Sequence, residues 1–207
     1  MCGRYTFEPG TKFYDRFDIS NRLDYLSKSY TVSPGKIMPV ITHDSSNLVW
    51  LMKWGLIPFW ANDSKIGEHM FNARAESVVE KPAFRKAFNT QRCLIPANGF
   101  YEWKPQAGKK IPYYFEIKDR PLFAFAGLYD IWTDPVSGKE TYSYTIVTSA
   151  PNETVKPIHD RMPVILEQKN ESIWLDKSTP TNTLVSLLQP SSESLIASLL
   201  TSGILRV

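Results

Sequence analysis

The chain has 207 residues, of which 43% are hydrophobic and 22% charged, and its formal net charge is +3. This length suits one domain with a substantial core, and the balance excludes a disordered or strongly acidic chain. No apolar run approaches the roughly 18 residues of a membrane helix, and no basic start precedes an apolar run, so we expect a cytoplasmic protein without a membrane partner.

Short apolar or alternating runs, mostly bounded by Gly, Pro, Asn or Asp, predict strands. These runs are 4–7, 36–42, 48–55, 93–96, 113–118, 122–128, 142–148 and 163–166. The turn cluster at 134–138 predicts a hairpin that joins 131–132 to the strand after it.

Helical spacing is less frequent than strand alternation, and it predicts short helices. These segments are 11–17, 76–88, 152–156, 171–175 and 181–188. The expected fold class is α+β, a single domain over 1–207 with a strongly curved, barrel-like, mainly antiparallel sheet and peripheral helices.

The basic residues are concentrated in the middle of the chain. Segment 81–110 holds seven basic residues against Glu102 alone, whereas 167–207 holds three basic and four acidic ones. A polyanion such as DNA would meet this middle segment, although a solvated lysine-rich face is at least as consistent with charge alone.

Cysteine and histidine usage argues against a metal site. The chain has two cysteines and three histidines, with no CxxC or HxxxH spacing, so no metal and no cofactor are expected. Cys93 lies in an apolar run and is expected to be a buried structural residue. His43 and His69 lie in polar sequence and are expected to face solvent.

Cys2 becomes the first residue if Met1 is removed, and it then carries a free amine beside a thiol. An α-amine titrates near about 8, against about 10.4 for lysine, so more of it is uncharged at neutral pH. Such a residue condenses with aldehydes: the amine forms a Schiff base and the thiol closes a thiazolidine ring. The alternative is a frayed terminus without function.

Polar residues interrupt apolar sequence at several points, which suggests a site. Asn72 precedes a predicted helix, and it either caps that helix or holds a ligand. Glu102 lies between aromatic residues, and it is either a proton shuttle or a salt-bridged surface residue. His159 lies between two prolines, where Asp160 or Arg161 could anchor the backbone and leave the imidazole to transfer a proton.

The aromatic segment 54–60 has two interpretations. Its rings could stack on unpaired bases, each contributing about 1–3 kcal/mol, or they could close one end of the sheet.

Taken together, six motifs resemble the SRAP family, the SOS-response-associated peptidases or abasic-site-processing proteins. The resemblance is strongest over 2–188. The motifs are Met1-Cys2-Gly3-Arg4-Tyr5, Ser33-Pro34-Gly35, Trp54-Gly55-Leu56-Ile57-Pro58, Asn72-Ala73-Arg74-Ala75-Glu76, Gly99-Phe100-Tyr101-Glu102-Trp103 and Ile158-His159-Asp160-Arg161-Met162-Pro163.

The resemblance implies a DNA-damage protein that binds single-stranded DNA and captures an abasic site as a covalent thiazolidine, with lyase and crosslink-reversal chemistry. It implies catalytic roles for Cys2, Asn72, Glu102 and His159. It also implies DNA contacts by Arg4, Pro34, Trp60 and Arg74. The expected partner is single-stranded DNA containing abasic sites, and the expected state is a monomer, associated with the nucleoid when bound to DNA.

Two departures from the family pattern stand out. Thr31 occupies a place where members commonly have Asn, which bears on one turn-forming or DNA-facing contact. Segment 191–207 diverges where members usually continue with a strand, so a final core strand is expected to be absent or replaced.

Two other functions remain open from the sequence. An N-terminal-nucleophile cysteine peptidase would use the Cys2 amine as its own base, and it could remove Met1 itself. A non-catalytic module for binding single-stranded DNA is favoured if Met1 stays attached and blocks the amine.

Overall fold

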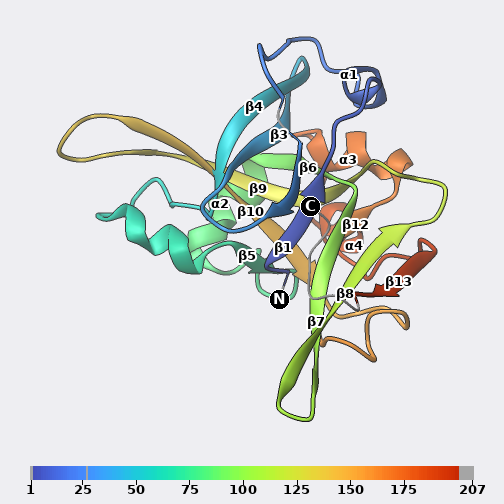
Figure 1. The fold of residues 1–207 in the computed structure, drawn as a ribbon. Helices are drawn as coiled ribbons and strands as arrows, with labels where there is room; N and C mark the ends of the chain where they lie inside the picture. Colours follow the sequence, from blue (N-terminus) through green and yellow to red (C-terminus); the bar gives the residue numbers. More distant parts are fainter. Residues whose placement is uncertain (1, 27, 201–207) are drawn as a thin grey trace.

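The structure is a computed structural model that describes residues 2–26 and 28–200. Its centre is a barrel, because the strand order β10-β4-β3-β6-β9 closes on itself through a β9–β10 pairing (Figure 1). The barrel strands are β3 (Ile37–Asp44), β4 (Ser46–Trp54), β6 (Arg92–Ala97), β9 (Phe123–Thr133) and β10 (Glu140–Ser149). Short strands extend this sheet: β5 (Asn72–Arg74), β11 (Met162–Pro163) and β12 (Ile165–Leu166).

A second sheet of five strands lies against the barrel in the order β13-β8-β7-β1-β2. Its strands are β1 (Arg4–Phe7), β2 (Ser29–Val32), β7 (Gly99–Gln106), β8 (Lys109–Ile117) and β13 (Leu195–Leu199). The strand pairings of this sheet that the structure describes are antiparallel. In the barrel sheet, β10 runs parallel to β4 and β5, and the other described strand pairs are antiparallel. The predicted α+β fold with a curved, mainly antiparallel sheet is confirmed.

Aromatic residues join the two sheets and hold β1 in place. Tyr5 on β1 is fully buried, its hydroxyl lies 2.8 Å from that of Tyr144 on β10, and its ring packs edge-on against Trp54. The Trp54 indole donates to the Phe71 carbonyl at 2.8 Å, just before β5. Because burying rings of this size contributes several kcal/mol, β1 and β5 are fixed to the barrel, and so is the N-terminal segment before β1.

The barrel interior is packed closely at β6, whose six residues are all buried. Cys93 on this strand is buried and free, as predicted. A Cβ at Gly127 on the neighbouring β9 would lie only 2.9 Å from Cys93 Sγ and 2.6 Å from Ile95 Cδ1. A larger residue at this position would therefore have to displace the Ile95 or Cys93 side chain.

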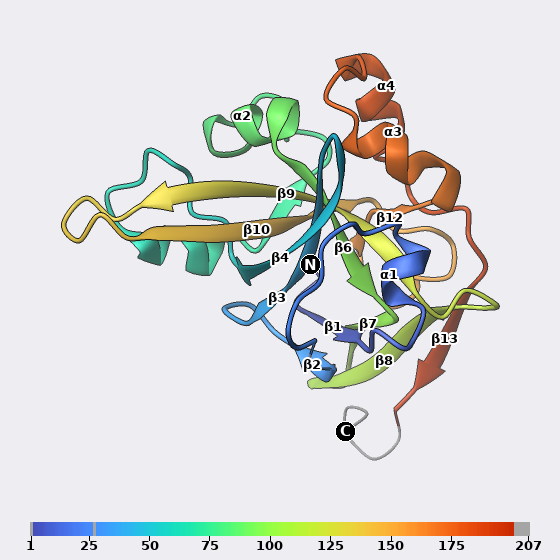
Figure 2. The same cartoon turned by 90° about the horizontal axis from the view of Figure 1, so that it is seen from above.

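Helices and 3-10 helices lie around the edges of the sheets (Figure 2). They are α1 (Phe13–Arg16), η1 (Ser64–His69), α2 (Pro82–Thr90), η2 (Gln168–Asn170), α3 (Glu171–Leu175) and α4 (Thr181–Ser186). Within the described residues, no helix is long and apolar enough to cross a membrane.

One predicted helix begins later than expected, and another is not formed. The helix expected at 76–88 begins only at Pro82, because a residue before proline is driven out of the α region, and Lys81 is extended with ψ 125°. Segment 152–156 forms hydrogen-bonded turns, with Asn152 Oδ1 accepting from Val155 N–H at 3.1 Å. A side chain that bonds the backbone in this way favours a turn over a continued helix.

The strand expected at 163–166 is divided between two neighbours. Val164 N–H donates to the Val147 carbonyl on β10, and the Val164 carbonyl accepts from Ala126 on β9. The chain therefore crosses from one barrel strand to the next at this residue, and β11 and β12 pair with different strands. The predicted β9–β10 hairpin is confirmed, with Asp134 Oδ1 accepting from two backbone N–H groups of its turn.

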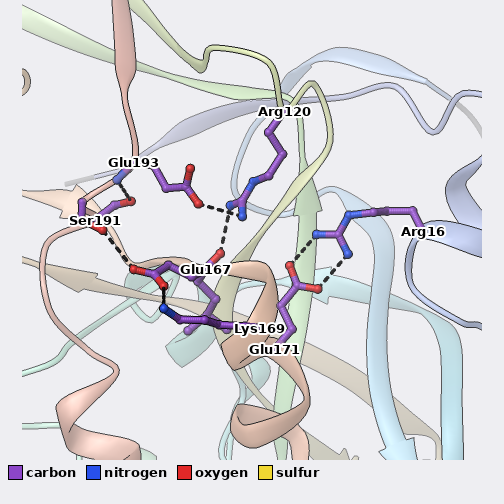
Figure 3. A network of polar contacts seen from close by, with 9 residues as sticks. Arg16, Arg120, Glu167, Lys169, Glu171, Ser191 and Glu193 are labelled. Atoms are coloured by element: carbon purple, nitrogen blue, oxygen red, sulfur yellow. Dashed lines mark hydrogen bonds and ion pairs between the residues drawn. The ribbon is translucent and has the colours of Figure 1, made fainter.

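The divergent C-terminal segment does contain a strand, β13, which pairs with β8 from Leu195↔Ile117 to Leu199↔Tyr113. β13 lies at the edge of its sheet, and none of its residues is fully buried. Before it, Glu193 pairs with Arg120 at 2.9 Å, within a group of charged contacts that includes Arg16 and Glu171 (Figure 3). Residues 201–207 lie outside the described part of the chain.

Candidate functional site

Cys2 lies two residues before the first residue of β1, and the pairing of β1 with β7 determines which β7 residue lies near it. Arg4 pairs with Tyr101 in antiparallel fashion, so Glu102, one residue further along β7, lies beside the segment before Arg4. The Cys2 side chain is fully buried, and its thiol donates to the Arg4 carbonyl at 3.9 Å. Burial, and next the Glu102 carboxylate, raise the pKa of the Cys2 thiol far above its usual range. Cys2 is therefore a fixed, neutral thiol, and the frayed alternative is wrong for this residue.

Asn72 reaches Cys2 from the barrel side. It lies on β5, which runs parallel to β10, and its Nδ2 donates to the Cys2 carbonyl at 2.8 Å. Its Oδ1 is buried and has no hydrogen-bond partner. The helix-capping interpretation is wrong, because the residue stands in a strand and the next helix starts at Pro82. This unsatisfied acceptor can receive a hydrogen bond from a donor group of a ligand.

Glu102 is withdrawn from water, with only 2% of its surface exposed. Burial raises the pKa of its carboxyl to about 8, because removal from water penalises the charged form. The surface location that the alternative interpretation required is therefore wrong. An acid with a pKa near the working pH can both donate and accept a proton, which is the property a proton shuttle needs.

His159 follows the turns at 153–158, in the connection between β10 and β11. Its Nε2 lies 3.6 Å from Glu102 Oε2, and its Nδ1 lies 3.0 Å from both Asp160 Oδ1 and the Arg161 backbone nitrogen. Burial lowers the pKa of His159. A small motion or a bound ligand would bring the imidazole and the Glu102 carboxyl within hydrogen-bond distance, where a proton can pass between them.

The two groups open onto one cavity of about 440 Å³. It is lined by Glu102, Trp103, Pro105, Lys110, Ile158, His159 and Asp160. Trp103 and Lys110 were missed as candidates, although Trp103 follows Glu102 directly in the motif and Lys110 belongs to the basic segment. Only the β7–β8 pairing brings Lys110 to this cavity, since its register partner is Pro105.

Arg161 joins two motifs that are far apart in the sequence. Its guanidinium forms a bidentate pair with Glu76 at 2.6 and 3.0 Å, and it also donates to the Thr148 carbonyl. The pairing lowers the pKa of Glu76, because the guanidinium favours the carboxylate. This clamp fixes the loop that carries His159 to the segment after β5. Sequence reasoning missed Glu76, whose only signal was its place at the end of the asparagine motif.

The expected DNA-contacting residues divide into two groups. Arg4 begins β1, two residues after Cys2, and Arg74 lies on β5 with Asn72 and is exposed. Pro34 belongs to a turn in which Gly35 has φ +89° and donates to the Trp54 carbonyl at 2.7 Å. Trp60 is 48% exposed and lines a separate hollow with Phe59, Pro82, Arg85, Lys86 and Asn89.

The two ends of the aromatic segment 54–60 differ in burial, so one end fits the interpretation as a closure of the sheet and the other fits the interpretation as a stacking surface. Trp54, Leu56 and Ile57 are buried in the core, whereas Phe59 and Trp60 are about half exposed. The first part closes the barrel, and the second leaves flat surfaces open to a partner. Within residues 2–26 and 28–200, no group of three or more His, Cys, Asp or Glu side chains could hold a metal ion.

Comparison with known proteins shows to which family this chain belongs. Residues 1–203 match the family described as SOS response associated peptidase (SRAP). The chain belongs to the SRAP family. The resemblance drawn from the six motifs is thereby confirmed.

Relatives of this SRAP chain include the abasic site processing protein YoqW of Bacillus subtilis, which is 48% identical over 197 residues and covers 92% of this chain and 87% of its own. The abasic site processing protein HMCES of Xenopus tropicalis is 34% identical over 81% of this chain and 59% of its own. A solved protein structure from Bacteroides thetaiotaomicron superposes with a TM-score of 0.90 at 33% identity, covering 97% of this chain and 93% of its own.

Proposed function

We propose that this SRAP protein processes abasic sites in single-stranded DNA by forming a covalent thiazolidine crosslink through Cys2. The observation that carries the proposal is the position of Cys2: its carbonyl is held by Asn72, and its thiol is buried close enough to Glu102 for the carboxylate to raise its pKa. The names of the relatives, abasic site processing proteins, support the same class of substrate.

The chemistry requires that Met1 be removed, so that the Cys2 amine is free. An abasic sugar is mostly a closed hemiacetal, and Glu102 acts as general acid and base to open it to the C1′ aldehyde. The amine then attacks C1′ and water leaves, which forms an imine. The Cys2 thiol adds across the imine, so that sulfur bonds to C1′ and the thiol proton passes to nitrogen. Because the amine and the thiol belong to the same residue, ring closure is intramolecular.

His159 donates a proton to the sugar oxygen released by ring opening, and so retards reclosure. The imine also acidifies the C2′ proton, which opens a strand-cleaving lyase branch. Ring closure to the thiazolidine consumes the imine and therefore suppresses that branch. Reversal of the crosslink uses the same groups in the opposite direction.

Basic and aromatic side chains around the site are suited to a DNA strand. Arg4 begins the strand that follows Cys2, Arg74 lies on the strand that carries Asn72, and both are proposed to bind phosphates. Trp60 and Pro34 are proposed to stack against or wedge between unpaired bases. The exposed half of the Trp60 surface is available for such stacking.

The test is a denaturing gel of the purified protein with labelled single-stranded DNA that carries one abasic site. A heat-stable shifted band is expected for the wild type, and it should be absent for Cys2→Ser and for protein that retains Met1. Cys93→Ala is the matched control, because Cys93 is a buried cysteine inside the barrel and should leave the band intact. Intact mass spectrometry reports the state of Met1.

Three results would contradict the proposal. A band that survives Cys2→Ser would exclude the thiazolidine. Cleavage of peptides without any DNA adduct would favour an N-terminal-nucleophile peptidase, and DNA binding without an adduct would favour a non-catalytic module.

A further inference from the structure

The His159 imidazole faces two different groups at one ring nitrogen. Nδ1 lies 3.0 Å from Asp160 Oδ1 and 3.0 Å from the Arg161 backbone N–H. The Arg161 N–H can donate only to a lone pair on Nδ1, whereas the Asp160 carboxylate can only accept from a protonated Nδ1. The two hydrogen bonds therefore exclude each other, and the position of the ring proton decides which one forms.

The choice at Nδ1 determines what Nε2 can do. When a neutral ring accepts from Arg161, its proton resides on Nε2, and Nε2 cannot take another. When Nδ1–H donates to Asp160, Nε2 presents a lone pair on the side of Glu102 Oε2, 3.6 Å away. Only the state bonded to Asp160 allows His159 to accept a proton from Glu102.

We propose that Asp160 is a positioning residue whose carboxylate holds the Nδ1–H form of His159, so that Nε2 can take the proton of Glu102. The inference rests on the proposed function, and it adds Asp160 as the residue that enables proton transfer from Glu102 to His159. The proton leaves Glu102 while its electron pair stays on the carboxylate, and it bonds to the Nε2 lone pair to give an imidazolium that Asp160 stabilises.

The resulting pair can open the hemiacetal with a closed proton balance. The Glu102 carboxylate takes the proton of the C1′ hydroxyl as the C1′ carbonyl forms. The imidazolium gives its Nε2 proton to the ring oxygen, which receives the electron pair of the breaking C1′–O4′ bond. Glu102 ends protonated and His159 neutral, as both began.

The environments of Glu102 and His159 explain why His159 needs Asp160 in order to accept the proton. Burial raises the pKa of Glu102 to about 8 and lowers that of His159, so the proton rests on Glu102 at neutral pH. Lys110 on β8 lines the same cavity, and the Arg161 guanidinium is turned to Glu76 and the Thr148 carbonyl. Among the residues that the structure describes, Asp160 provides the carboxylate that contacts Nδ1 of His159.

The substitution Asp160→Asn in the full chain tests this role. Asp160 has 88% of its side chain exposed, so the fold does not depend on it. Its carboxylate raises the pKa of both His159 and Glu102. Its removal is therefore expected to lower the midpoint of the His159 titration and to shift the pH profile of adduct formation to lower pH.

The titration is followed by NMR of the labelled imidazole, whose nitrogen shifts also report the tautomer. In Asp160→Asn the neutral ring is expected to move to the Nε2–H form bonded to Arg161. Glu153→Gln is the matched control, because Glu153 lies in the turns before His159 with 90% of its side chain exposed. Asp160→Glu keeps a carboxylate and is expected to restore most of the shift.

An unchanged titration, tautomer and pH profile in Asp160→Asn would overturn the inference, and so would an equal shift in Glu153→Gln. Absence of any adduct from the wild type would instead overturn the proposed function. The NMR titration needs no DNA, so it decides the role of Asp160 separately.

Discussion

Glu102 and Glu171 are both carboxylates withdrawn from water, with 2% and 6% of their surfaces exposed, but they have different partners. Glu171 receives two hydrogen bonds from the Arg16 guanidinium, at 2.6 and 2.9 Å (Figure 3). Glu102 faces a neutral imidazole at 3.6 Å, and burial raises its pKa to about 8. The Arg16 guanidinium is a permanent cation fixed to the Glu171 carboxylate, whereas burial brings the pKa of Glu102 close to the working pH, where the carboxyl can gain and lose a proton.

The two regions should therefore respond differently to substitution. The region of Glu171 joins α1 to α3 and serves stability. The region of Glu102 is the proposed centre of proton transfer, and it serves activity.

The largest expected effect is on the chemistry at Glu102. Glu102→Gln keeps the size of the side chain but removes the transferable proton, and general acid–base catalysis contributes about 10²–10⁴-fold. We expect the rate of adduct formation to fall by at least about 100-fold, with the urea unfolding midpoint not lowered. A rate within a few-fold of the wild type would remove Glu102 from the mechanism.

The next effect concerns the stability contributed by Arg16. Arg16→Met leaves the Glu171 carboxylate buried without its cation, and breaking such a pair costs about 3 kcal/mol or more. Urea unfolding measures this loss. The double variant Arg16→Met with Glu171→Leu should recover most of it, because no buried charge remains. A single variant as stable as the wild type would show that the pair is not structural.

The pH dependence of stability tests the raised pKa of Glu102. The folded-state pKa of Glu102 is about 8, above its ordinary value of 4.5, so the native state binds more protons than the unfolded state between these values. This contribution is fully present below about pH 4.5, and it is lost as the pH rises toward 8, with a slope of up to about 1.4 kcal/mol per pH unit. Glu102→Gln should remove that slope, which urea unfolding at several pH values would measure. An identical slope in both proteins would contradict the raised pKa.

The smallest expected effect is at the C-terminal segment. Glu193 pairs with Arg120 at 2.9 Å, with 24% and 16% of their side chains exposed. Glu193→Gln should lower the unfolding free energy by less than about 1 kcal/mol and leave adduct formation unchanged, because a partly exposed pair is screened by water. A large loss of activity would mean that this segment acts on the site.

Much of the fold could be predicted from local patterns. Alternating apolar residues identified β1 at its observed bounds and the cores of the main barrel strands, since each strand pattern reports one buried face. The predictions that failed were those decided by a neighbour. Pro82 moved a helix start, and Val164 divided a strand between β10 and β9.

Residue chemistry determined that Cys2, Asn72, Glu102 and His159 were the groups to examine, because their types in apolar sequence require partners. Only the tertiary structure decided which partners they have: Asn72 bonds the Cys2 carbonyl, Glu102 is buried beside His159, and Arg161 clamps Glu76. Pairings across 70 or 85 residues leave no trace in local sequence periodicity. Burial, which sets the pKa of Glu102, is likewise a property of the assembled sheets and not of the neighbours along the chain.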